Sequence, residues 1–202
     1  AVEQVQRGSC SALVTAPIAK HAWHAAGHHY PGQTERLAEL CDKTTASMLF
    51  TARSPQSGWR LNTLLATTHI PLAAVPRQLS DRRISHKLDV LLAFCQRFQP
   101  QPRLVVAGLN PHAGEAGQLG RDEVNWLIPC LEQWRQRHPQ VELIGPLPPD
   151  TCWLDAGLAW RGEQTQASDG YLALYHDQGL IPVKLLAFDA AVNTTLGLPF
   201  MR

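Results

Sequence analysis

The chain has 202 residues, 45% of them hydrophobic and 17% charged, with a formal net charge of +1. This composition is typical of a globular protein with a sizeable core, in one large domain or two small ones. It excludes a basic surface for nucleic acid or membrane binding, and no apolar run is long enough for a transmembrane helix or a signal-peptide core.

Strands and helices are predicted to alternate along the chain. In chain order they are a strand at 11–17, a helix at 34–40, strands at 46–52 and 61–68, a helix from Ser80 to Phe98, a strand at 103–109, a helix at 122–138, and strands at 141–147, 171–175, 183–188 and 191–197. Thr34 and Ser80 are the expected N-caps, and Pro129 should kink or split its helix. The alternation predicts an α/β fold with a largely parallel sheet.

Three histidines each follow a predicted strand. His69 follows 61–68, His112 follows 103–109 and His176 follows 171–175. Ligands of such sheets bind at the carboxyl ends of strands, and three imidazoles with an open position suit a divalent metal. The alternative for each is an ordinary hydrogen-bonded or exposed histidine in a turn, and the residues alone leave both open.

The neighbours of these histidines include charged side chains. Four roles are open for Asp177: hydrogen-bond partner of a metal ligand, metal ligand, substrate contact or ordinary turn residue. Lys184 falls in the predicted apolar strand 183–188, where a lysine needs a partner such as a phosphate ester. Lys20 is a second candidate cation. No GxGxxG, P-loop, GxSxG or CxxC motif occurs, and the five scattered cysteines predict reduced thiols in a cytoplasmic protein.

Seven stretches are distinctive when they are taken together in chain order. They are TAPIAKHAWHAAG, YPGQTERLAEL, LLATTHIPL, VVAGLNPHAGEAGQLGRDE, GPLPPDT, YHDQGLIPVK and VNTTLGLPF. Together they resemble the 4-hydroxythreonine-4-phosphate dehydrogenase family of pyridoxal 5′-phosphate (vitamin B6) biosynthesis, across nearly the whole chain.

The resemblance implies a reaction and a fold. The reaction is the NAD-dependent oxidation and decarboxylation of 4-phosphohydroxy-L-threonine to 3-amino-2-oxopropyl phosphate, with Zn²⁺, Mg²⁺, Co²⁺ or Mn²⁺ held by His69, His112 and His176. The fold is a two-domain isocitrate/isopropylmalate-dehydrogenase-like α/β architecture. It also implies a homodimer with the active site at the subunit interface, in the cytoplasm, without nucleic-acid or membrane partners.

The resemblance also implies roles for further residues. Candidate catalytic groups are Lys20 and Asp177, and candidate substrate contacts are Gln33, Thr34, Asn110, Asp150, Lys184, Asn193 and Arg202. Many family members have His where this chain has Gln33. Because an amide cannot carry charge, a proton-transfer role at that position is in doubt.

The family's members are longer than this chain, so residues 1–202 are expected to be the central portion, spanning parts of two α/β domains and inactive alone. Two other functions stay open. One is a related dehydrogenase acting on another phosphorylated or acidic hydroxy compound. The other is a metal-binding module that hydrolyses an ester without NAD or has no catalytic activity.

Overall fold

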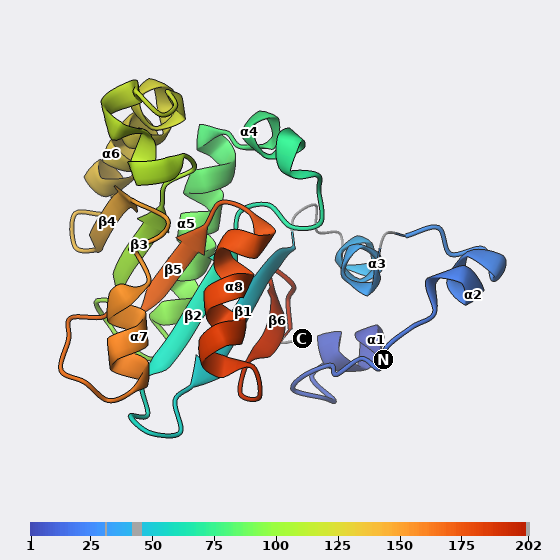
Figure 1. The fold of residues 1–202 in the computed structure, drawn as a ribbon. Coiled ribbons are helices and arrows are strands. Elements are labelled where there is room, and N and C mark those ends of the chain that lie inside the picture. Colours follow the sequence, from blue (N-terminus) through green and yellow to red (C-terminus); the bar gives the residue numbers. More distant parts are fainter. Residues whose placement is uncertain (31, 42–45, 201–202) are drawn as a thin grey trace. The chain divides into compact units, whose positions relative to one another are not determined.

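A computed structural model describes residues 1–30, 32–41 and 46–200, which form two compact units (Figure 1). Unit 1 comprises Ala1–Met48 with Thr194–Arg202, and unit 2 comprises Leu49–Asn193. That the chain spans parts of two α/β domains stays a prediction. No helix in the described ranges is both long and apolar enough to cross a membrane.

The helices of unit 1 are short. They are α1 (Val2–Gln6), α2 (Lys20–Ala25) and α3 (Gln33–Leu40). The strand predicted at 11–17 is wrong, because only Ala12 forms an isolated bridge and Val14 is almost fully exposed rather than buried in a sheet. The cap prediction at Thr34 is also wrong. Gly32 is the N-cap, in an extended conformation, and Thr34 lies inside α3.

The sheet has the order β4-β3-β5-β2-β1-β6. Its strands are β1 (Ser47–Arg53), β2 (Arg60–Leu65), β3 (Arg103–Ala107), β4 (Glu142–Leu147), β5 (Gly170–Ala173) and β6 (Val192–Leu196). β1 and β2 form an antiparallel hairpin, whereas β2, β5, β3 and β4 pair in parallel. This confirms the predicted largely parallel sheet.

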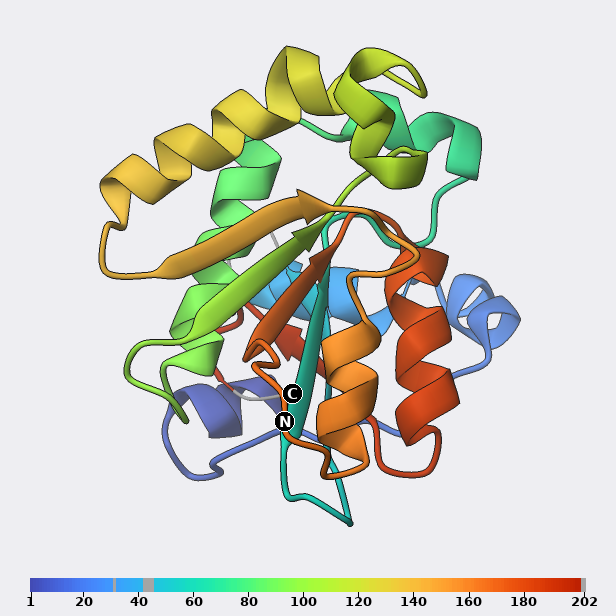
Figure 2. The ribbon, with the colours of Figure 1, turned by 60° about the vertical axis from the view of Figure 1, so that its left-hand side comes forward.

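Helices cover both faces of this sheet. They are η1 (Leu72–Ala74), α4 (Val75–Gln78), α5 (Asp81–Cys95), η2 (Pro111–Gly117), η3 (Glu123–Leu127), α6 (Ile128–Arg137), α7 (Leu154–Trp160) and α8 (His176–Ala187). Figure 2 shows α5 and α6 on one face and α7 and α8 on the other. Parallel neighbours need such crossovers, since a tight turn can only reverse the chain.

The core under α7 and α8 shows why α8 lies so close to the sheet. Val105, Tyr171 and Val183 are buried in one apolar cluster between the sheet and these helices. A Cβ atom on Gly179 would come within 2.7 Å of the Leu65 side chain and 2.9 Å of that of Ala173. A glycine at this position therefore permits the close packing of α8 on β2 and β5.

Local sequence signals had mixed outcomes. The Ser80 side chain accepts a hydrogen bond from Arg83 N and caps α5, as predicted. The helix around Pro129 is not split: the π-helical turn η3 continues directly into α6, and Leu127 and Ile128 both keep helical backbone angles. The predicted helix ends earlier than expected, at Cys95, and Phe98 is exposed beyond it.

The strand predicted at 183–188 is wrong, because these residues belong to α8 and the loop after it. Leu180, Val183 and Ala187 are buried at helical spacing, and a short apolar run does not distinguish a strand from a buried helix. Lys184 is consequently exposed on a helix rather than enclosed in a strand.

Candidate metal and substrate site at the carboxyl edge of the sheet

Three neighbouring parallel strands bring the three histidines to one edge of the sheet. β3, β5 and β2 are adjacent, and His112, His176 and His69 follow their carboxyl ends. Because parallel strands end on the same side, the segments that carry these histidines are neighbours in space although they are 43 to 107 residues apart in sequence.

The imidazoles of His69 and His176 face one another. Their ring centroids are 5.1 Å apart and their planes are inclined by 45°. An ion about 2.1 Å from one nitrogen of each of two imidazoles, in tetrahedral geometry, would hold the centroids about 5 Å apart. The centroid separation of the two rings is therefore compatible with a shared divalent ion.

His176 opens α8, and the next residue orients its ring. His176 Nδ1 lies 2.7 Å from Asp177 Oδ1, so the imidazole donates to the carboxylate and Nε2 remains for an ion. The Asp177 side chain is exposed, whereas that of His176 is partly buried. This is the arrangement in which a carboxylate fixes the tautomer of a metal-binding histidine.

His112 lies in an unusual turn. Residues 112 to 116 all have positive φ values, between 43° and 81°, which makes η2 a left-handed turn. His112 itself is exposed. Among the described residues no group of three or more His, Cys, Asp or Glu side chains is close enough to hold a metal. The structure therefore brings together His69 and His176, and does not bring His112 into contact with them.

Asn110 points into the protein beneath this turn. Its Nδ2 donates to Asp122 Oδ2 at 3.0 Å and to Glu123 Oε2 at 2.9 Å. Its amide fills the space that a Cβ atom on Gly120 would need. In this conformation the amide nitrogen of Asn110 serves the loop, and its role as a substrate contact stays a prediction.

The remaining predicted site residues are more scattered. Lys184 lies two turns along α8 from His176, Asp150 follows the carboxyl end of β4, and Asn193 is the second residue of β6; all three are exposed. Lys20, Gln33 and Thr34 belong to unit 1, where Gln33 Nε2 donates to Ala16 O, and Arg202 lies outside the described residues. Their parts in the site stay predictions.

Two buried polar residues at this edge were missed in the sequence. They are Glu123, which is 0% exposed, and Gln178, which is 7% exposed. Gln178 is the third residue of α8, but the N-cap is Tyr175 rather than Ser or Thr, so the capping-box pattern that could have indicated Gln178 is incomplete. No local pattern indicates Glu123, because its partners come from a loop that begins 14 residues earlier.

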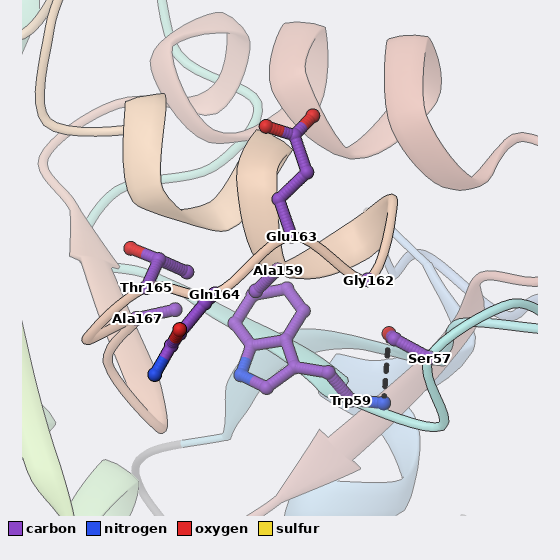
Figure 3. A pocket seen from close by; sticks show the side chains of 8 residues that line it. All are labelled: Ser57, Trp59, Ala159, Gly162, Glu163, Gln164, Thr165 and Ala167. Atoms are coloured by element: carbon purple, nitrogen blue, oxygen red, sulfur yellow. Dashed lines mark hydrogen bonds between the residues drawn. The ribbon is translucent and has the colours of Figure 1, made fainter.

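Features elsewhere in unit 2 offer less chemistry. A shallow pocket of about 270 Å³ surrounds Trp59 at the opposite edge of the sheet, beside Ala167 before β5 (Figure 3). Burial raises the pKa of Cys95 and of Cys152 to about 12 each. These two thiols stay protonated at neutral pH and are unsuited to nucleophilic catalysis.

The fold and the histidine pair together define the class of protein. It is an α/β protein with a mostly parallel sheet, and its histidine pair lies at the carboxyl ends of the strands, where such sheets bind ligands. The family described as pyridoxal phosphate biosynthetic protein PdxA matches residues 1–202. The chain belongs to this family, and the resemblance seen in the sequence and the isocitrate/isopropylmalate-dehydrogenase-like fold class are confirmed.

Relatives in sequence and in structure agree. A 4-hydroxythreonine-4-phosphate dehydrogenase from Synechococcus sp. (strain RCC307) is 67% identical over the whole of this chain, and one from Aquifex aeolicus is 40% identical. The crystal structure of the enzyme of that name from Klebsiella pneumoniae matches with a TM-score of 0.83 at 40% identity, over 100% of this chain and 57% of that one. The chain spans 62% of the Synechococcus relative.

Proposed function

We propose that the protein catalyses the NAD- and metal-dependent oxidation and decarboxylation of 4-phosphohydroxy-L-threonine to 3-amino-2-oxopropyl phosphate. The carrying observation is the His69–His176 pair at the carboxyl edge of the sheet, in a chain whose relatives are named as this dehydrogenase. NAD⁺, when bound, would accept a hydride from the carbinol carbon, while a base of the chain would take the hydroxyl proton. The β-keto acid that forms then loses CO₂.

The residues of the site divide the work. His69 and His176, with His112 as the third ligand, would hold a divalent ion that stabilises negative charge on the substrate oxygen. Asp177 keeps the His176 ring oriented through its hydrogen bond to Nδ1. The Lys184 ammonium binds the substrate phosphate, which its exposed position on α8 allows. Lys20 and Asp177 remain the candidate bases, and NAD is proposed from the family alone.

A surface on α8 supports the proposed homodimer. Ile181, Leu185 and Phe188 are 59%, 80% and 74% exposed and are spaced along one side of the helix that begins at His176. A second copy covering this apolar surface would bring its own residues close to the site. We place the enzyme in the cytoplasm, where reduced thiols such as the buried Cys95 and Cys152 are the rule.

The test measures NADH formation from 4-phosphohydroxy-L-threonine with NAD⁺ and each divalent metal. It uses both the 202-residue chain and the translated product of its complete gene. We expect turnover by the gene product and none by the chain alone. Ester hydrolysis without NADH would support the hydrolytic alternative, and absence of both activities from the gene product would refute the proposal.

A matched pair of variants of the gene product tests the phosphate contact. Lys184→Ala should raise KM for the phosphorylated substrate about tenfold, the effect of losing one charge-assisted hydrogen bond. Arg97→Ala removes an exposed cation from the end of α5 and should leave KM unchanged. An equal KM in both variants would show that Lys184 does not bind the substrate phosphate.

A second candidate function is supported by one structural relative. Terephthalate 1,2-cis-dihydrodioldehydrogenase from Burkholderia xenovorans LB400 matches with a TM-score of 0.73 at 25% identity. The family's fold therefore also carries a dehydrogenase named for a non-phosphorylated diol. A panel of hydroxy acids, diols and phosphorylated hydroxy compounds with NAD⁺ distinguishes the two functions.

A further inference from the structure

Two residues before each candidate metal ligand, hydrogen bonds hold the chain at the carboxyl ends of the strands. These positions are Thr67, Asn110 and Leu174. The bonds connect with one another through two buried side chains. We call the connected set Thr67, Gly108, Leu109, Asn110, Glu123, Leu174 and Gln178 the strand-end network.

The first link joins the ends of β2 and β5. The carbonyl oxygen of Leu174 accepts from Thr67 N at 3.2 Å and from Thr67 Oγ1 at 2.7 Å. The amide nitrogen of Leu174 donates to Gln178 Oε1 at 2.6 Å. Leu174 therefore fixes the strand ends that lead to His69 and His176 against each other.

The second link joins β5 to β3. Gln178 Nε2 donates to Gly108 O at 2.6 Å, while its Oε1 holds Leu174. A glutamine fits this place because its amide offers one acceptor and one donor on the same short group. A carboxylate could accept from Leu174 but would face the carbonyl oxygen of Gly108 without a proton to donate.

The third link joins β3 to the left-handed turn. Glu123 Oε1 accepts from Leu109 N at 2.7 Å and from Asn110 N at 2.8 Å, and Oε2 accepts from the Asn110 side chain. Glu123 also packs against the turn, because a Cβ atom on Gly114 would come within 2.6 Å of Oε2. Three N–H donors satisfy this fully buried carboxylate.

We propose that Gln178 and Glu123 are positioning residues, which set the spacing of the three histidine-bearing segments through this network and thereby tune divalent-metal affinity. This inference rests on the proposed function. Neither side chain needs to touch the ion, since hydrogen bonds behind the ligands commonly change metal affinity 10- to 100-fold.

The chain contains a matched control for the central residue. Asn62 is buried like Gln178; its Oδ1 accepts from Thr51 Oγ1 at 2.7 Å and its Nδ2 donates to Asp169 O at 2.8 Å. Asn62 belongs to β2, and its partner Asp169 directly precedes β5, at the end of that strand opposite to Gln178. Gln178→Glu and Asn62→Asp therefore remove the same kind of bond, from a buried amide to a backbone carbonyl, at the two ends of one strand.

The experiment measures Zn²⁺ and Co²⁺ affinity by calorimetry, together with thermal stability, in the wild-type chain and both variants. We expect Gln178→Glu to weaken metal binding at least tenfold and Asn62→Asp to leave it unchanged, although both lower the melting temperature. Thr67→Val is a milder change that removes only the hydrogen bond from the Thr67 hydroxyl to Leu174 O. It should also weaken metal binding, and it replaces Gln178→Glu as the test if that variant does not fold. Equal metal affinity in all folded variants overturns the inference.

Imidazole NMR shifts of His112 and His176 in the metal-free chain separate this inference from the proposed function. Gln178→Glu should move both resonances and Asn62→Asp neither. If the shifts move but the gene product binds no metal, the proposed function fails and the positioning role stands. If the wild-type chain binds metal but the shifts and affinities of the Gln178 and Thr67 variants do not change, only the positioning role fails.

Discussion

Strand β5 has a buried side-chain amide at each end, and the two have different surroundings. Asn62 ties the amino end through Asp169 O, which also accepts from Cys95 Sγ. Gln178 ties the carboxyl end, where His69 and His176 face each other. The bonds are alike, so the bonds themselves do not mark a site. A buried side-chain amide therefore joins neighbouring strands at either end of β5. Whether such a junction serves a binding site depends on the residues that follow the strands.

Backbone conformation sharpens the contrast between the two edges. Among the described residues, every non-glycine residue with positive φ lies in the left-handed turn at the carboxyl edge, at His112, Ala113, Glu115 and Ala116. At the opposite edge positive φ occurs at glycines such as Gly58 and Gly162. Non-glycine residues pay for this conformation, and such strain is commonly found at functional sites.

The largest expected effect is the loss of His112, which we propose as the third metal ligand although it does not contact His69 or His176 in the structure. Residues that only hydrogen-bond to a metal ligand change metal affinity by up to roughly 100-fold. His112→Ala should lower metal affinity by more than that, and should also abolish turnover of the gene product. Calorimetry and NADH absorbance measure both. His24→Ala, which removes an exposed imidazole from α2, is the control. Full activity of metal-free His112→Ala would disprove the assignment.

A pair of glycines tests whether the left-handed turn is as tightly held as its contacts indicate. Gly114 and Gly162 have the same φ of +81°, but a Cβ atom on Gly114 would meet Glu123 Oε2 at 2.6 Å, whereas the nearest atom to one on Gly162 is 3.7 Å away. Gly162→Ala should cost about 1 kcal/mol of unfolding free energy, for the left-handed conformation alone. Gly114→Ala should cost about 2 kcal/mol more through overpacking. Urea denaturation compares them, and equal losses would contradict the contact argument.

The thiol of Cys95 reports on the amino end of β5. Its Sγ contacts Asp169 O, the oxygen that Asn62 also binds, and it is 1% exposed. Asn62→Asp should speed labelling of Cys95 by a thiol reagent about tenfold, because about 1.4 kcal/mol less is needed for local opening. Mass spectrometry in a Cys10→Ser background locates the label. Gln178→Glu, at the other end, should leave the rate near the wild-type value; equal acceleration would mean that the two ends open together.

The smallest expected effect is a pH dependence at the amino end. Burial raises the pKa of Asp169 above its ordinary value, although Arg103 N donates to the carboxylate. The unfolded chain then ionises first, so the contribution of Asp169 to stability falls as pH rises from about 4 through the folded pKa. Because the group is partly exposed, we expect less than about 1 kcal/mol. Asp169→Asn should remove this slope in unfolding measured from pH 3 to 7, while Asp155→Asn should keep it.

The sequence by itself determined the family, most strands and the Ser80 cap, because these depend on local patterns and on motifs read along the chain. It also placed three histidines at strand ends. The strand predicted at 183–188 was wrong, because this short apolar run belongs to α8 and the loop after it. The strand predicted at 11–17 was also wrong, because Val14 is exposed rather than buried in a sheet.

Only the tertiary structure decided which groups meet. The order β3-β5-β2 makes neighbours of segments that are far apart in the chain, and it sets the distance between the rings of His69 and His176. The partners of Gln178 and Glu123 follow from the same arrangement, since Gly108 is 70 residues from Gln178 in sequence. Hydrogen bonds across a parallel sheet join strands whose sequence separation is set by the crossover helices, so no local pattern could have predicted them.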